Sequence, residues 1–460
     1  MEQIEVREIG IGRAGKSSYL FSNRDLFKLF LPLMVEQLLE FLVGLAASIM
    51  VAYVGEAAVS GVSLVDFIMA LLINLFAALA TGGAVIAGQY MGKKQMKEAR
   101  EAANQMVWFV GAISIVVMII VYLVKPFILY SLFGQISDEV RGHANTYLMI
   151  VTASVPFLAL YNVGAAIFRT MGNSKVSMKV ALHVNGINVA GNALLLYGLH
   201  FGTEGVAIPT LISRIIGAVV IILLAMNHKH PLYIEKSIKI KFQWSMIKRI
   251  LNIGVPYGIE NSLFQIGRIL VLSLVSTFGT AAIAANAVGG TIVLFQVLPG
   301  IAINLGLTAV IARCVGSGDY EQAKYYNRKI LIIVYISQIV MNAIVLALLP
   351  VILHLYGLSE ITASLTTKIV LWHGICASFI WPLAYTLPVT FRASGDARYP
   401  MVIGITTMFV CRIVMAYLLG DYFHMEVFGT WVAMFIDWIA RAVFFIYRYF
   451  SKKWMQFRAI

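Results

Sequence analysis

Residues 31–40, LPLMVEQLLE, and residues 255–264, VPYGIENSLF, decide how this chain is organised. Each stretch places a glutamate four residues after a proline, inside a long apolar segment. Three pairs of identical residues share one constant offset along the chain: Pro32 and Pro256, Glu36 and Glu260, Leu39 and Leu263. Identical residues at one fixed offset indicate an internal repeat.

The offset persists much further along the chain. It sets VGEAAV at 54–59 over FGTAAI at 278–283, and it also aligns Gly82 with Gly306, Gly92 with Gly316 and Ala99 with Ala323. Later, FRTMGNSK at 168–175 lies over FRASGDAR at 391–398, at an offset shorter by a single position. The chain is therefore interpreted as a duplicated unit.

The composition is typical of a membrane protein. Of 460 residues, 60% are hydrophobic and 12% are charged, against about 25% charged residues in soluble domains. Apolar runs long enough to cross about 30 Å of hydrocarbon as helices recur along the chain. We count twelve, at 26–54, 59–90, 105–130, 144–168, 177–198, 204–226, 249–277, 281–312, 330–355, 364–390, 400–420 and 428–447.

The net charge of +13 is explained by orientation and needs no nucleic-acid partner. Most Lys and Arg residues fall in alternate loops, six of them within 229–249. Cytoplasmic loops of membrane proteins carry this excess. We therefore expect a multi-pass protein of the cell membrane, specifically of a bacterial plasma membrane. Both termini should lie in the cytoplasm.

These features predict an all-α integral membrane protein with twelve transmembrane helices in two parallel six-helix repeats. Such repeats form two lobes related by an axis along the membrane normal, an architecture of secondary transporters. The predicted segments are a cytoplasmic tail (1–25), an N-lobe (26–226), a cytoplasmic linker (227–248), a C-lobe (249–447) and a second cytoplasmic tail (448–460).

One motif points to another class of protein. GIGRAGKSS at 10–18 fits the phosphate-binding loop pattern through Gly10, Gly15, Lys16 and Ser17. A nucleotide-binding domain needs roughly 100 residues, and about 25 precede the first span. We interpret the match as chance in a basic tail, and an ATP-dependent membrane protein stays a weak alternative.

Several motifs in one order resemble the multidrug and toxic compound extrusion (MATE) family. They are the proline and glutamate of the first span, VGEAAVSG at 54–61, GGAVIAGQYMGKKQMKEA at 82–99, FRTMGNSK and FRASGDARYP. The resemblance covers nearly the whole chain. It implies two six-helix lobes, alternating access, and efflux of organic, often cationic, compounds driven by proton or sodium entry. It implies no enzyme.

Carboxylates inside spans are the first candidates for ion coupling, because an ionisable group in the membrane is costly and usually functional. Glu36 and Glu40 lie one turn apart on one helix face, and Glu260 has Asn261 and Gln265 nearby. Desolvation disfavours the charged form of a buried carboxyl group, so these groups could exchange protons or pair with a cationic compound. We expect Glu260 to carry the proton; packing through hydrogen bonds is the alternative.

Weaker candidates are other polar residues in the spans. They are Asp66, Asn74 and Thr81 in the second span, Asn188 and Asn192 in the fifth, Gln296 and Asn304 in the eighth, and His373, Arg412 and Asp437. Histidine changes charge near neutral pH. For each of these residues, hydrogen bonding between helices is the simpler role.

The chain departs from the family pattern where many relatives carry aspartates. In the first span the corresponding position is Ala47, and in the fifth span it is Asn192, four residues after Asn188. The tenth span offers HGICASFIWPLAY at 373–385 and no aspartate. These departures favour protons over sodium ions as the coupling ion.

The leading hypothesis is a proton-coupled antiporter that exports small amphiphilic, cationic organic compounds. Its partners would be the lipid bilayer, the compound and protons or sodium ions, with the protein acting as a monomer. Cys314, Cys376 and Cys411 lack paired spacing, so neither a metal site nor a cofactor is expected. The alternative with the same architecture is a flippase for a lipid-linked oligosaccharide or another lipid-like substrate, which would need a more cationic central cavity.

Overall fold

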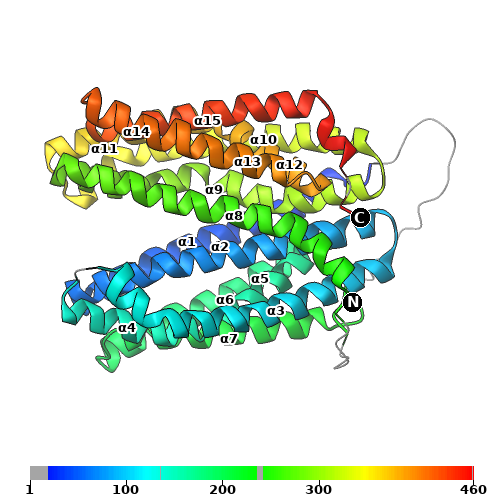
Figure 1. The fold of residues 1–460 in the computed structure, drawn as a ribbon, viewed down its shortest axis with the longest axis horizontal. Helices are drawn as coiled ribbons and strands as arrows, with labels where there is room; N and C mark the ends of the chain where they lie inside the picture. The colour runs from blue at the N-terminus through cyan, green and yellow to red at the C-terminus, as the bar shows by residue number, and fades with distance from the viewer. Residues whose placement is uncertain (1–18, 135, 236–241, 458) are drawn as a thin grey trace.

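The structure is a computed structural model that describes residues 19–134, 136–235, 242–457 and 459–460. The GxxxxGKS motif around Lys16 lies outside these residues. Figure 1 shows two stacked groups of helices, α1 to α7 below and α8 to α15 above, which are the predicted N-lobe and C-lobe. The described residues contain no strand.

The N-lobe consists of seven α-helices. These are α1 (Asn23–Ala52), α2 (Glu56–Gly92), α3 (Met96–Phe127), α4 (Asp138–Thr152), α5 (Val155–Thr170), α6 (Ser174–Ala193) and α7 (Glu204–Ala225). Single π-helical turns, Ile128–Leu132 and Leu194–Gly198, extend α3 and α6.

The C-lobe repeats this pattern. Its α-helices are α8 (Trp244–Val275), α9 (Thr280–Gly316), α10 (Tyr320–Tyr356), α11 (Glu360–Phe379), α12 (Leu387–Ser394), α13 (Arg398–Thr407), α14 (Met415–Tyr417) and α15 (Glu426–Phe450). Shorter turns join or end them: Ser276–Phe278, Pro382–Thr386, Met408–Val414, Leu418–Tyr422 and Lys453–Gln456.

Within the described residues, ten helices are long and apolar enough to cross a membrane by themselves, and two bent pairs, each counted as one span, bring the number to twelve. The pairs are α4 with α5, bent by 48°, and α11 with Pro382–Ser394, bent by 58°. Pro156 and Pro382 lie at these bends, where a proline removes a backbone donor and disturbs the helix. The predicted twelve spans and two repeats are confirmed, and the bends fall in the corresponding fourth span of each repeat.

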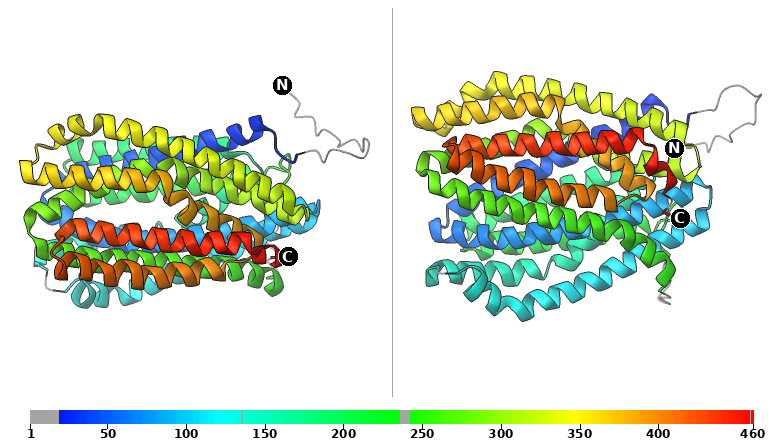
Figure 2. Two further views of the ribbon diagram at one scale, coloured as in Figure 1. Left: turned by 90° about the horizontal axis from the view of Figure 1, so that it is seen from above. Right: turned by 45° about the horizontal axis from the view of Figure 1, so that its top comes forward.

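The long helices run side by side along one axis, and the start of α1 and the C-terminal end of the chain lie at the same end of it (Figures 1 and 2). We call this the terminal end; α2 and α9 also finish there, at Gly92 and Gly316. Parts of the predicted tails are packed at this end, since Phe21 and Trp454 are buried.

The lobes touch most closely at the terminal end, through glycines that the repeat pairs. A Cβ atom on Gly92 would lie 2.2 Å from the Arg313 carbonyl oxygen, and one on Gly316 would lie 2.0 Å from that of Gln89. A Cβ atom on Gly82 would lie 2.5 Å from the Ile250 carbonyl oxygen. Only glycine lets these backbones approach so closely.

Hydrogen bonds between the lobes gather at the same end. Gln89 Nε2 donates to the Ala393 carbonyl at 2.8 Å, and Arg313 Nη2 donates to the Thr170 carbonyl at 2.8 Å. The Phe21 amide donates to the Tyr326 hydroxyl at 2.8 Å, and that hydroxyl donates to the Phe21 carbonyl at 2.7 Å. The structure is therefore closed between the lobes at the terminal end.

Candidate functional site

Each repeat holds its glutamate against the arginine of its own FR motif. In the N-lobe, Glu36 Oε1 lies 3.8 Å from Arg169 Nη1, and Glu36 Oε2 accepts a hydrogen bond from Ser177 Oγ at 2.8 Å. In the C-lobe, Arg392 Nη2 donates to Glu260 Oε2 at 2.8 Å. The glutamate lies on the first helix of each repeat and the arginine near the end of the bent span. The repeat therefore reproduces a buried ion pair.

The C-lobe pair belongs to a larger charged network. Glu260 Oε1 lies 3.9 Å from Arg441 Nη1, and Arg441 Nε donates to Asp437 Oδ1 at 2.9 Å, one turn away on α15. Arg441 Nη2 also donates to the Gly404 carbonyl at 2.9 Å. A Cβ atom on Gly404 would lie 2.8 Å from Glu260 Oε1, so a larger residue there would displace the glutamate carboxylate from its present position.

A cavity of about 230 Å³ adjoins this network. Glu260, Asn261 and Arg392 line it together with aromatic side chains, which are Tyr257, Phe264, Trp381 and Tyr385. The guanidinium carbon of Arg392 lies 4.4 Å from the Tyr257 ring centroid. We call this space the C-lobe cavity.

Arginines outnumber carboxylates around the Glu260 network of the C-lobe. Four arginines, Arg268, Arg392, Arg412 and Arg441, share the region with Glu260 and Asp437. Arg412 lies over the Phe264 ring at 5.0 Å, its Nε is buried without a hydrogen-bond partner, and no described carboxylate is within 4.0 Å. Arg268 donates to Gln265 Oε1 at 3.3 Å. Arg268 was not predicted, although a charged residue in the span 249–277 was the available signal.

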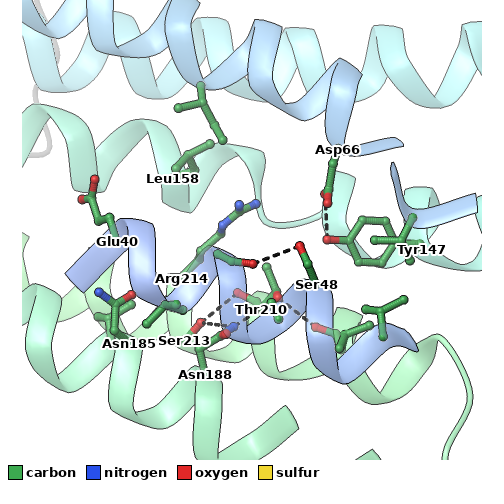
Figure 3. A pocket seen from close by; sticks show the side chains of 18 of the residues that line it. Glu40, Ser48, Asp66, Tyr147, Leu158, Asn185, Asn188, Thr210, Ser213 and Arg214 are labelled. Atoms are coloured by element: carbon green, nitrogen blue, oxygen red, sulfur yellow. Dashed lines mark hydrogen bonds between the residues drawn. The ribbon is translucent and has the colours of Figure 1, made fainter. Parts of the chain in front are cut away.

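The N-lobe contains a larger cavity, of about 460 Å³, shown in Figure 3. Three charged side chains line it: Glu40 from α1, Asp66 from α2 and Arg214 from α7. Tyr147 donates to Asp66 Oδ1 at 2.9 Å. In the view of Figure 3, Arg214 is seen between Glu40 and Asp66. We call this space the N-lobe cavity.

Amides and hydroxyls from α6 and α7 form the polar wall of the N-lobe cavity. Asn188 Nδ2 donates to Thr210 Oγ1 at 3.1 Å, and Asn192 Nδ2 donates to Asn188 Oδ1 at 3.2 Å behind it. Ala47 also lines the cavity, so the position at which the resemblance implies an aspartate is apolar. The cavity keeps its polarity without that carboxylate.

Glu40 lies where the N-lobe cavity meets the space between the lobes. It lines the N-lobe cavity and also a pocket of about 290 Å³ that includes Phe41 of α1 and Leu294 of α9. Gln37 Nε2 donates to Glu40 Oε2 at 2.9 Å. No Lys, Arg or His nitrogen of the described residues lies within 4.0 Å of its carboxylate. Glu36 and Glu260 each have an arginine partner, whereas Glu40 has no basic partner among the described residues.

Of the other predicted residues, Thr81 and Asn304 line the C-lobe cavity, whereas those that follow lie outside both cavities. His373 Nδ1 is 2.6 Å from Gln296 Oε1, and its ring contacts Trp431 and Trp438, so it is packed in the core. Asn74 Nδ2 donates to the Ala70 carbonyl of its own helix at 2.8 Å. Gln265 and Arg412 likewise line neither cavity.

Arg214 is the functional candidate that sequence reasoning missed. A single arginine inside the apolar run 204–226 was a signal of the kind used for the glutamates. Asn185 and Tyr161, which also line the N-lobe cavity, were overlooked as well.

Comparisons with known proteins agree with the duplicated fold. The family model MatE matches residues 32–194 and 256–418, two copies related by the same offset that pairs Pro32 with Pro256. The chain is 26% identical over 443 residues to the uncharacterized transporter YisQ of Bacillus subtilis, covering 94% of this chain and 95% of that protein. It is 24% identical to a probable multidrug resistance protein NorM of Thermotoga maritima, covering 94% and 93%.

A solved structure has the same fold. It is described as the outward-facing conformation of a multidrug resistance MATE family transporter of the MOP superfamily. The TM-score is 0.88 at 18% identity, and the match covers 94% of this chain and 96% of that one.

Proposed function

The chain belongs to the MatE family of membrane transporters, and we propose that it is an antiporter that exports small amphiphilic organic compounds, cationic ones included, in exchange for protons. The observation that carries the proposal is the N-lobe cavity with Glu40 at its mouth between the lobes.

The N-lobe cavity suits a small organic compound. Its volume of about 460 Å³ lies in the range of roughly 300–1,000 Å³ found for small-molecule sites. Aliphatic residues such as Val62 and Leu158 supply an apolar wall, while Asn188 and Thr210 supply hydrogen bonds. Amphiphilic compounds need both kinds of wall.

Glu40 is the carboxylate best placed to exchange a proton for a cationic compound. It has no basic partner within 4.0 Å, whereas Glu260 is already held by Arg392 at 2.8 Å. A proton on Glu40 removes the charge that would hold a cationic compound, so the two ligands compete for one group. Such competition couples the export of one to the entry of the other.

The absence of two aspartates from the N-lobe favours protons over sodium ions as the coupling ion. The positions at which the resemblance implies aspartates are Ala47 and Asn192, so a sodium ion would find fewer anionic ligands there. A single carboxylate is enough to carry a proton.

The closed contacts at the terminal end support alternating access. The basic loops, including 93–100 and 313–329, lie at that end and favour placing it in the cytoplasm. With the cytoplasmic side closed, the cavities would open outward. In the inward-open state the same contacts would break, and compounds would enter from the cytoplasm.

A flippase for a lipid-linked or similar anionic substrate is the second candidate. The observation in its favour is the local excess of arginines around the Glu260 network, where Arg268, Arg392, Arg412 and Arg441 accompany the two carboxylates Glu260 and Asp437. Such a flippase would bind an anionic headgroup there.

Transport by purified protein in proteoliposomes tests the proposal, with pH and sodium gradients imposed separately and rhodamine 123 as the cationic dye. We expect a pH gradient to drive dye accumulation and a sodium gradient to fail. Glu40→Gln should abolish the gradient-driven part and weaken binding of the cationic dye, because the neutral amide cannot hold its charge, and Glu139→Gln on the exposed start of α4 serves as the matched control. Dye transport driven by sodium alone would contradict proton coupling, and lipid flipping without dye transport would favour the second candidate.

A further inference from the structure

Arg214 lies in the N-lobe cavity with most of its hydrogen-bonding capacity unused. A guanidinium group carries five N–H donors. Among the described residues only Nη1 has a hydrogen-bond partner, the Ser154 hydroxyl oxygen at 2.7 Å. No carboxylate oxygen of those residues lies within 4.0 Å of its nitrogens. Arg214 lines the cavity, so these remaining donors are available to a group bound there.

The acidic groups of the cavity do not pair with this arginine. Asp66 accepts the Tyr147 hydroxyl at 2.9 Å, and Glu40 accepts the Gln37 amide at 2.9 Å. Both stay beyond ion-pair distance of Arg214. The cavity is therefore dipolar, with its positive group separated from both negative groups.

Two further polar groups of the same cavity have no partner. Asn185 Nδ2 and the Tyr161 hydroxyl are buried and make no hydrogen bond with the described residues. Buried donors without partners are costly. Both residues line the N-lobe cavity, so its wall carries unsatisfied donors beside the space that a compound would fill.

We propose that Arg214 forms a subsite for a small anionic group, a carboxylate carried by the transported compound. This inference rests on the proposed export function and narrows its substrate class. A planar guanidinium with free N–H groups binds a carboxylate through two parallel hydrogen bonds. Glu40, at the mouth, then holds a cationic group of the same compound. The N-lobe cavity accordingly prefers amphiphiles with both an amine and a carboxylate over compounds with the amine alone.

A matched pair of dyes tests this subsite. Rhodamine 110 has a free carboxylate, and rhodamine 123 is its methyl ester with the same fluorophore. Binding to the purified protein is measured by fluorescence polarisation. We expect the wild type to bind rhodamine 110 more tightly than the ester, and Arg214→Gln to reduce rhodamine 110 binding at least about tenfold while changing ester binding less than about threefold.

Two further variants separate recognition from folding. Arg214→Lys should restore part of the preference, because the charge remains while the two-pronged geometry is lost. Arg141→Gln, which removes an arginine from the start of α4 outside the cavity, should leave the preference intact. Thermal stability and elution as a single species check the fold of each variant.

Failure of the Arg214 subsite and failure of the proposed export function would give different results. Equal losses for both dyes in Arg214→Gln would assign the arginine a purely structural role and overturn the inference. No preference between the dyes in the wild type would overturn it too. If the wild type shows the preference but transports neither dye under a pH gradient, the subsite stands and the export proposal fails.

Discussion

At the scale of single residues, the ion pair between Glu260 and Arg392 changes how the C-lobe carboxylate is understood. From the sequence, Glu260 was expected to carry the proton. That expectation did not consider its arginine partners, which only the structure reveals. A proton on Glu260 would leave Arg392 without its counter-charge in a buried site. Breaking one side of a buried pair costs about 3–5 kcal/mol. The geometry therefore favours a positioning role for Glu260 beside the C-lobe cavity.

Glu260→Gln should lower both the melting temperature and dye transport, because Arg392 loses its charged partner. The double variant Glu260→Gln with Arg392→Gln should regain most of both, since the charge that lost its partner is removed and Arg441 keeps its pair with Asp437. Glu36→Gln is the matched comparison from the N-lobe and should do less harm, because its arginine is 3.8 Å away. A double variant that is stable yet inactive would contradict the positioning role and would indicate that Glu260 is the obligatory proton carrier.

At the scale of secondary-structure elements, α2 and α9 depend on glycines where they cross at the terminal end. A Cβ atom on Gly316 would lie 2.0 Å from the Gln89 carbonyl oxygen, which belongs to a helix backbone and cannot rotate away. The helices would have to separate. Gly290 lies in the same helix, α9, and a Cβ atom there meets nothing within 4 Å.

Gly316→Ala should therefore destabilise the closed contact by about 1–3 kcal/mol, the usual range for overpacking. Transport should fall, and the melting temperature should fall with it. Gly290→Ala is the control and should be neutral or slightly stabilising, because alanine has the higher helix propensity. Equal behaviour of the two variants would show that the crossing of α2 and α9 does not limit stability or transport.

At the scale of the whole molecule, the distribution of positive charge predicts which end faces the cytoplasm. Lys229 lies exposed in the segment that follows α7, at the terminal end, and Asp138 lies exposed at the start of α4. An even number of spans places the two termini on one side of the membrane. Lys229 and Asp138 should then lie on opposite sides.

Cysteines placed singly at these two positions test the orientation. The background is a variant in which Cys314, Cys376 and Cys411 are replaced by serine. In intact cells a membrane-impermeant maleimide should label Asp138→Cys, and it should label Lys229→Cys only after the membrane is opened. Labelling of Lys229→Cys in intact cells would invert the topology and, with it, the direction of transport.

Much of the architecture was predictable because the membrane restricts the solutions. The bilayer requires long apolar helices, so the twelve spans were evident from composition, and the fixed offset revealed the two lobes. The bends in the spans 144–168 and 364–390 were not predicted, although Pro156 and Pro382 mark them. A proline predicts a kink only where the packing of neighbouring helices accepts one.

The sequence by itself determined the twelve spans, the duplication and the residues that the repeat pairs, because periodic hydrophobicity and a fixed offset are properties of the chain in one dimension. Only the tertiary structure decided which charges meet. Glu36 and Arg169 are far apart along the chain, on the first and fourth spans, yet 3.8 Å apart in space. Arg214, in contrast, has no carboxylate within 4.0 Å among the described residues. Electrostatic energy depends on the distance and the medium between two groups, and both are known only once the helices are packed.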